Sequence, residues 1–80
     1  MARLRLFAGA REAAGTDRDV IDASSVGAVL DEAEARYGAG FSAVLATCRV
    51  WCNGEPAGRD DRVGPDDEVA VLPPVSGGSI

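Results

Sequence analysis

The stretch that most constrains the fold of this chain is its C-terminal segment, because a strand ends there at two consecutive prolines. Residues 68–72 (Glu-Val-Ala-Val-Leu) alternate with the two-residue period of a pleated strand. Pro73 and Pro74 have no backbone N–H, so strand pairing stops there and the chain continues in an extended, polyproline-like form. Residues 76–78 (Ser-Gly-Gly) are slim, and glycine allows close backbone approach. The sequence therefore predicts a core strand leading into a thin tail, residues 73–80, that is presented to other proteins.

Length and charge restrict the class of protein. Eighty residues suffice for one domain with one sheet and about one main helix, and the 46% hydrophobic content is ordinary for a folded chain. The net charge of −5 argues against nucleic acid or an anionic membrane as the main partner. All basic residues are arginine, so the chain offers no lysine as an isopeptide acceptor, and acyl chemistry of that kind would involve its C-terminus.

Membrane, disulfide and metal-binding roles are not expected. No apolar run approaches the roughly 18–20 residues of a membrane span, and no leader-like segment is present, so we expect a cytoplasmic protein. Cys48 and Cys52 lie four residues apart in a predicted strand, about 13 Å, which is too far for a disulfide. Two thiols without histidine also fall short of a zinc or iron–sulfur site. We therefore predict structural thiols, no metal and no bound cofactor.

The first third of the chain predicts two strands. Residues 3–7 alternate, which places both leucines on the core face and Phe7 on the opposite face with the arginines. Residues 9–15 are bracketed by glycines and predict a loop with one helical turn. Residues 17–22 alternate poorly and are highly charged, as is typical of a strand at a sheet edge.

A helix follows. Ser24 or Ser25 can cap its start, and Gly38 is a natural C-terminal stop. Residues 41–45 predict a further short helical turn under the sheet. One apolar stripe at helical spacing marks the face of the main helix that packs on the core: Val26, Val29, Leu30, Ala33 and Tyr37.

The remaining chain predicts a strand, a hairpin and the final strand. In residues 48–52, the cysteines and Val50 face one way, and Trp51 faces the other with Arg49. Asn53-Gly54 is a strong hairpin signal because both residues tolerate positive φ. Residues 58–64 are polar and turn-rich.

This order of elements predicts an α+β protein of the β-grasp class. A mixed sheet of four to five strands would pack on one main helix within residues 1–72, and residues 73–80 would form the tail. Phe7, Trp51 and Leu72 would then share the sheet face away from the helix, where an exposed apolar patch usually marks a partner surface. The alternative is that loops fold over these side chains.

Several motifs resemble the small subunit of molybdopterin synthase, a ubiquitin-like sulfur carrier related to the carrier of thiamine thiazole synthesis. They are residues 6–8 (Leu-Phe-Ala), 11–12 (Arg-Glu), 15–17 (Gly-Thr-Asp), 50–55 (Val-Trp-Cys-Asn-Gly-Glu) and 67–78. The last of these ends in Pro-Pro-Val-Ser-Gly-Gly and is the most specific part. The resemblance spans essentially the whole chain and favours the molybdopterin branch through the Leu-Phe-Ala and Arg-Glu opening.

The resemblance implies a chemistry at Gly78. An E1-like adenylyltransferase would activate its carboxylate with ATP, and a sulfurtransferase or cysteine desulfurase would convert the adenylate to a thiocarboxylate. In the large subunit of molybdopterin synthase, the tail would then donate sulfur to cyclic pyranopterin monophosphate. The chain would not be an enzyme on its own, because it contains no recognisable catalytic constellation. Gly77 would let the tip pass. The reach of the tail would be set by Pro73, Pro74, Val75 and Ser76. The partner face would be formed by Phe7, Trp51 and Leu72.

Ser79 and Ile80 depart from the family pattern, in which the second glycine is terminal. Three explanations are open. A peptidase could remove these two residues, or they could be an artefact of the sequence as written. In the third, the protein has kept the fold as a binding module without sulfur chemistry. A carrier for thiazole, cysteine or another sulfur-containing metabolite also stays open. A β-grasp ferredoxin is excluded, because two cysteines are too few to bind its iron–sulfur cluster.

Overall fold

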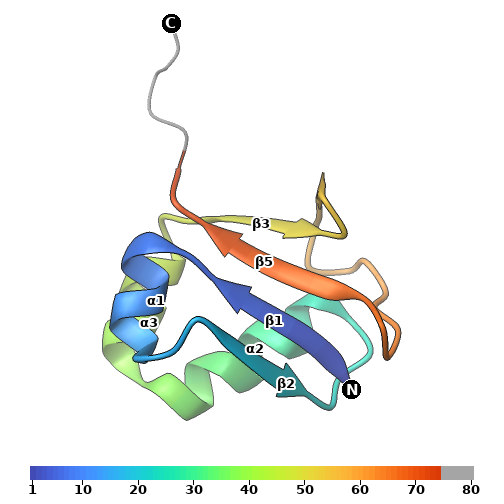
Figure 1. Ribbon diagram of the computed structural model, residues 1–80, viewed down its shortest axis with the longest axis horizontal. Helices are drawn as coiled ribbons and strands as arrows, with labels where there is room; N and C mark the ends of the chain where they lie inside the picture. The colour runs from blue at the N-terminus through green and yellow to red at the C-terminus, as the bar shows by residue number, and fades with distance from the viewer. Residues whose placement is uncertain (75–80) are drawn as a thin grey trace, which may run out of the picture.

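The computed structural model describes residues 1–74, and its centre is a five-stranded sheet with the strand order β2-β1-β5-β3-β4 (Figure 1). β1 and β5 are parallel, and the other neighbouring strands are antiparallel. This is the mixed β-grasp sheet that the sequence predicts, with β2 at one edge as expected. The elements are β1 (Ala2–Leu6), α1 (Ala8–Ala14), β2 (Arg18–Ile21), α2 (Val26–Tyr37), α3 (Ala39–Leu45), β3 (Arg49–Cys52), β4 (Glu55–Pro56) and β5 (Glu68–Leu72).

The hydrophobic core lies between one face of the sheet and the helices. The predicted strand parity is confirmed, because the core-facing residues of the two central strands have almost no exposed surface. In Figure 1 no helix of the described residues 1–74 passes in front of the strands, so these residues place no helix on the second face of the sheet, which we call the outer face. The core consists of Ala2, Leu4, Leu6, Ala10, Ile21, Val26, Val29, Leu30, Ala33, Phe41, Val63, Val69 and Val71.

The main helix begins and ends where the sequence predicts. Of the two candidate caps, Ser25 is the one used, and its Oγ accepts a hydrogen bond of 3.1 Å from the N–H of Ala28. This bond satisfies one of the backbone donors left open at a helix start. Gly38 follows the last turn with φ of 90°, a conformation that favours glycine. The predicted apolar stripe is buried except for Tyr37, which is partly exposed.

The segment after β1 differs from the expected loop, because α1 is a seven-residue helix. Phe7 does not extend the strand as predicted but takes the N-cap position in an extended conformation. The helix ends at Gly15, which has φ of 79° and donates its N–H to the carbonyl of Arg11 at 2.9 Å. Four alanines in seven residues give high helix propensity, and Ala10 is fully buried in the core.

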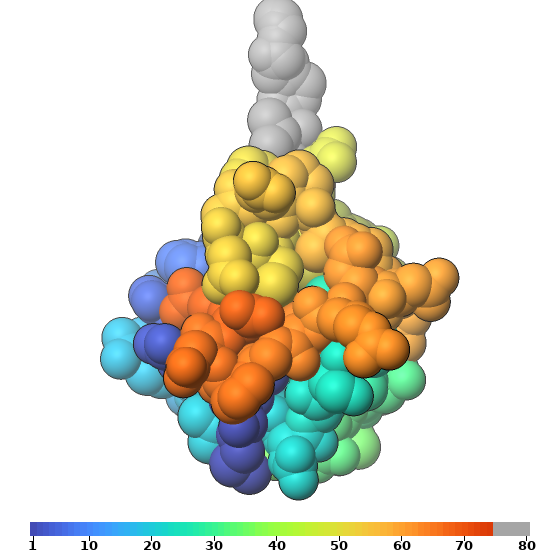
Figure 2. All heavy atoms as spheres, turned by 90° about the vertical axis from the view of Figure 1, so that its right-hand side faces the viewer, coloured from blue at the N-terminus to red at the C-terminus, as the bar shows by residue number. Residues whose placement is uncertain are grey.

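The polar segment between β4 and β5 also contributes to the core. Val63 is 5% exposed, which the turn-rich composition of this segment does not indicate. The segment is held against the start of α2, where Val26 N–H donates to the Asp61 carbonyl and Gly27 N–H to the Arg59 carbonyl, both at 2.9 Å (Figure 2, orange against turquoise). A Cβ at Gly27 would lie 3.1 Å from the Arg59 carbonyl oxygen, so this close contact favours a residue without a side chain.

The predicted hairpin joins β3 to β4. Asn53 and Gly54 have φ of 53° and 85°, as their turn requires. The Asn53 side chain also fixes the start of β5, because it donates to Asp67 at 2.9 Å and accepts from the Glu68 N–H at 3.0 Å. Hydrogen bonds from the Gly64 N–H and from Asn53 lower the pKa of Asp67.

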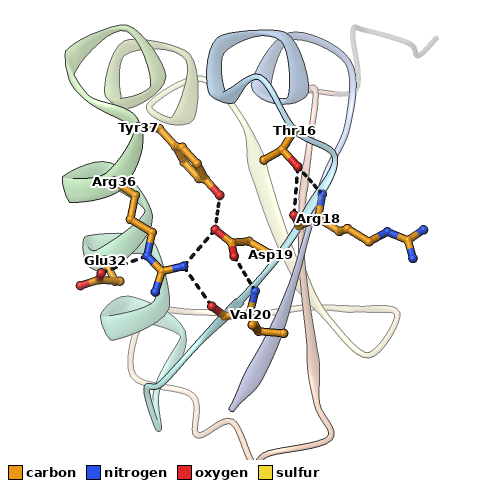
Figure 3. Close-up of polar contacts among 7 residues, drawn as sticks. All are labelled: Thr16, Arg18, Asp19, Val20, Glu32, Arg36 and Tyr37. Carbon is orange, nitrogen blue, oxygen red and sulfur yellow. Dashed lines mark hydrogen bonds and ion pairs between the residues drawn. The ribbon is translucent and has the colours of Figure 1, made fainter.

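A polar network ties the end of α2 to the edge strand β2 (Figure 3). Arg36 contacts the Asp19 carboxylate at 2.9 Å and Glu32 at 3.0 Å, and the Tyr37 hydroxyl donates to Asp19. Burial acts to raise the pKa of Asp19, but hydrogen bonds from Tyr37, the Val20 N–H and Arg36 outweigh it and lower the pKa. Burial, together with the hydrogen bond to Asp19, raises the pKa of Tyr37 to about 12.

The raised pKa of Tyr37 predicts an alkaline limit to stability. The neutral phenol is favoured in the folded state, so its contribution is complete below the ordinary value of 10.0 and is lost as the pH rises through about 12. Tyr37 is the only tyrosine, so tyrosinate absorbance reports it directly. We expect the folded protein to titrate well above the protein in concentrated urea. The same midpoint in both states would show that the hydroxyl is not held by Asp19.

Candidate functional site

The candidate site is built around the carboxyl end of β5. β5 lies in the middle of the sheet, with β1 on one side and β3 on the other, so the segment that follows leaves from the centre of one sheet end. Strand pairing ends at Leu72, as the two prolines predict, and Pro73 and Pro74 are exposed. Four predicted site residues, Val75, Ser76, Gly77 and Gly78, and the following Ser79 and Ile80, lie outside the described residues.

The strand register brings the other predicted site residues to the outer face beside this end. Ala70 of β5 is opposite Trp51 of β3, so the tryptophan has the same parity as Leu72. On the other side, the Phe7 N–H donates to the Val71 carbonyl at 3.1 Å, which continues the parallel β1–β5 register and places Phe7 beside Leu72. The structure therefore places these three side chains around the end of β5, and we call them the apolar platform: Phe7, Trp51 and Leu72.

The platform is less exposed than the sequence predicts. All three side chains are partly buried, and the exposed large hydrophobic residues of the described chain are instead Met1 and Val20. Part of the cover comes from the outer face itself, because the Arg5 guanidinium lies 5.3 Å from the centre of the Phe7 ring. Such stacking is a cation–π contact and shields one side of the ring. The expected open apolar patch is thus a semi-exposed surface edged by arginine.

Arginines are the residues of this site to which the sequence interpretation assigned no role. Arg49 is directly opposite Leu72, and Arg5 is opposite Ala70 in the β1–β5 pair. The signal was present in the alternation of residues 3–7 and 48–52, which puts these arginines on the face of Phe7 and Trp51. The platform therefore has a charged border on both neighbouring strands.

The cysteines are not part of this site. Cys48 and Cys52 are partly buried and pack against the core. Burial raises the pKa of both thiols, and the nearby Asp67 and Asp61 carboxylates raise that of Cys52 further. They are therefore protonated near neutral pH and poor nucleophiles.

Two further features are lacking in residues 1–74. No group of three or more potential metal-ligating side chains occurs in this part of the chain. Its helices are also too short or too polar to span a lipid bilayer.

Sequence comparison identifies the family. Residues 4–78 match the model of the ThiS family, so the match covers nearly the whole chain and its last residue is Gly78. The chain belongs to the ThiS family. It is thus a member of the ubiquitin-like sulfur carriers, as the motifs in its sequence indicate. Comparison with curated protein sequences gives no match.

Solved structures with the same fold include relatives of this ThiS-family chain. SAMP1 from Haloferax volcanii is 33% identical with a TM-score of 0.77, and the match covers 96% of this chain and 98% of that one. Small archaeal modifier protein 1 from Methanosarcina acetivorans is 28% identical with a TM-score of 0.83, covering 96% and 95%. A putative molybdopterin converting factor subunit 1 from Pyrococcus furiosus is 24% identical with a TM-score of 0.78, covering 92% and 97%, and at this identity shows the fold alone. These structures confirm the ubiquitin-like β-grasp fold.

Proposed function

We propose that the chain carries sulfur as a thiocarboxylate on Gly78 and donates it to cyclic pyranopterin monophosphate in molybdopterin biosynthesis. The observation that carries this proposal is the family match, which ends on Gly78. The central strand β5 leads directly into the Pro73-Pro74 segment that precedes this glycine. From Pro73 to Gly78 an extended chain spans at most roughly 20 Å. This reach suits insertion of a glycine tip into the pocket of a second protein.

The proposed chemistry begins with cleavage, because Ser79 follows Gly78. Hydrolysis of this peptide bond by a processing peptidase frees the Gly78 carboxylate. One carboxylate oxygen then attacks the α-phosphorus of ATP on an E1-like adenylyltransferase, and pyrophosphate leaves. A persulfide held by a sulfurtransferase or cysteine desulfurase attacks the acyl carbon and displaces AMP, and a thiol reductant cleaves the resulting S–S bond. The product is the thiocarboxylate.

In this scheme the chain is a substrate and carrier, while its partners catalyse each step. ATP is bound by the adenylyltransferase, so the chain itself needs no cofactor. The large subunit of molybdopterin synthase would receive the charged tail, with the apolar platform at the interface. Such an exchange between soluble partners fits a cytoplasmic location.

The choice of acceptor rests on the sequence motifs at residues 6–8 and 11–12, which favour the molybdopterin branch. Thiazole and cysteine synthesis are the alternatives, because a carrier for either would use the same fold and tail. Reconstitution distinguishes them. The chain ending at Gly78, once charged, should convert cyclic pyranopterin monophosphate with the large synthase subunit of the same genome, and should not support thiazole formation.

A second candidate function is protein modification through the Gly78 carboxylate. The 33% identity to SAMP1, a protein of the modifier class by its name, favours it. The activated glycine would then form an isopeptide with a lysine of another protein. Probing host extracts with an antibody to the chain separates the functions: a ladder of high-mass conjugates supports modification, and a single band at the mass of the free chain supports sulfur transfer. A ubiquitin-like interaction module without either chemistry would leave Gly78 uncharged.

The first enzymatic step tests the proposal directly. The chain ending at Gly78 is mixed with the E1-like adenylyltransferase of the same genome and ATP, and pyrophosphate release is measured. We expect release with this chain and none with the chain ending at Ile80, because only the former has a glycine carboxylate. Equal release with both would show that Gly78 is not the activated residue.

The apolar platform gives a separate prediction about binding. Trp51→Ala should weaken binding to the large synthase subunit by about 10–100-fold, because buried tryptophans dominate interface free energies. The free energy of unfolding should change by only about 1 kcal/mol, because Trp51 packs on the outer face and not in the core. Isothermal titration and urea denaturation measure the two effects. Val44→Ala, which removes a partly buried side chain of α3, is the control that should affect stability and not binding.

A further inference from the structure

The outer face of the sheet concentrates positive charge on an otherwise acidic protein. The chain has eight basic and thirteen acidic residues. Strand pairing places four of the arginines on the outer face but only one carboxylate, Glu68. The surface outside this face is correspondingly strongly acidic. The four residues, which we call the arginine face, are Arg3, Arg5, Arg18 and Arg49.

The arrangement of these arginines disfavours folding. Arg5 of β1 is directly opposite Arg18 of β2 in the antiparallel pair, and both side chains lie on the same face. Like charges directly opposite one another destabilise a sheet. A glutamate or threonine at either position would avoid this repulsion. This pairing therefore does not contribute to the stability of the sheet.

Contacts within the described chain leave the guanidinium groups of the arginine face largely available to bind a partner. The Arg5 guanidinium is 3.6 Å from Glu68, and its Nε is buried without a hydrogen-bond acceptor. Arg18 reaches Asp17 only at 4.0 Å, and both side chains are more than half exposed. Arg3 donates to a backbone carbonyl at 3.3 Å and has no ion pair within residues 1–74. Exposed pairs of this kind contribute little free energy. They would therefore compete only weakly with a carboxylate of a partner for these arginines.

The arginines also line a concavity. Arg3, Arg5 and Arg18 border a hollow of about 290 Å³ over β1, β2 and β5, together with Leu4, the exposed Val20 and the carboxylates Glu68 and Asp19, of which Asp19 is already paired with Arg36. A hollow of this size accommodates one or two side chains. The exposed Val20 in its lining suits a carboxylate side chain flanked by an apolar group, and the net charge of −5 disfavours a phosphate backbone as the partner.

We propose that the hollow bordered by Arg3, Arg5 and Arg18 is a docking site for an acidic loop of a partner protein. Guanidinium groups bind carboxylates with two parallel hydrogen bonds, so aspartate or glutamate side chains of the partner would occupy the hollow. Arg49 extends the positive charge to the apolar platform at the end of β5. One partner surface therefore contacts both the hollow and the start of the tail. That this partner is also the protein that receives the tail rests on the proposed function.

The test is an NMR titration of the isotope-labelled chain with a hexaglutamate peptide. We expect shift changes concentrated in β1, β2 and β5, and an affinity that falls as salt is added. Arg5→Gln with Arg18→Gln should weaken binding at least fivefold and leave the urea midpoint unchanged or higher, because the repulsion is removed. The control is Arg11→Gln with Arg62→Gln, which changes the same charge away from the outer face and should bind as the wild type does.

The docking site would be overturned by shift changes elsewhere on the surface, by equal binding of hexaglutamine, or by equal loss in the Arg11/Arg62 control. Tighter binding of a hexathymidylate oligonucleotide than of hexaglutamate would overturn it in favour of nucleic acid. The titration uses no ATP and no activating enzyme. Its failure therefore leaves the sulfur-carrier function standing, and failure of pyrophosphate release leaves the docking site standing.

Discussion

Gly78→Ala, in the chain ending at residue 78, is expected to slow thiocarboxylate formation by about two orders of magnitude. The activating enzyme must hold the terminal carboxylate within reach of the α-phosphorus of ATP, and a misplacement of about 1 Å can lower a rate about 100-fold. A Cβ at the tip both widens the tail and restricts its backbone. The rate is measured as pyrophosphate release, and the charged product is measured by mass spectrometry.

The same substitution should leave the fold unaffected. Within residues 1–74, which the structure describes, the thirteen core residues run from Ala2 to Val71, and position 78 comes after all of them in the sequence. A change outside the core is usually worth within about 0.5 kcal/mol, or less than about 4 °C in a domain of this size. An unchanged rate would show that the activating enzyme does not require glycine at the tip. A large fall in the melting temperature would show that the tail packs on the domain.

Phe41→Ala should cause the largest loss of stability, about 3–5 kcal/mol. Phe41 is the largest fully buried side chain of residues 1–74, and its ring meets the Tyr37 ring edge-on at 5.2 Å between centroids. An 80-residue domain has a total stability of about 4–12 kcal/mol, so the expected loss is between about a quarter and all of it. Urea denaturation followed by far-ultraviolet circular dichroism measures the difference.

Val20→Ala is the matched control for this loss. Val20 is 49% exposed at the edge strand, so its truncation should change the free energy of unfolding by less than about 0.5 kcal/mol. If the two variants had similar urea midpoints, α3 would not hold the core in the way the structure indicates.

The main helix and the faces of the strands were predictable because each is encoded locally. Ser25 and Gly38 mark the ends of α2, and the period of its apolar residues marks the buried side. The alternation of the strand residues fixed which side chains leave the core, so the shared outer face of Phe7, Trp51 and Leu72 followed once the strand order was known. For the site, the sequence thus predicted the location of the platform.

Features that depend on long-range packing were not predictable. The two glycines that bracket α1 resemble turn signals and predict only one helical turn within a loop, while the burial of the full helix through Ala10 depends on the rest of the fold. Val63 enters the core because its segment pairs with the start of α2, a contact without a local pattern. The opposition of Arg5 and Arg18 likewise depends on strand register, which single-strand alternation does not specify.

The most direct test of the sulfur-carrier function is the intact mass of the untagged protein isolated from its native host. The account predicts a chain that ends at Gly78, with part of the population heavier by the exchange of one oxygen for sulfur. Treatment with an alkylating reagent should shift only this heavier fraction, because a thiocarboxylate is a nucleophile. A chain that retains Ser79 and Ile80, and whose mass does not change after incubation with host extract and ATP, would contradict the account and favour a binding module.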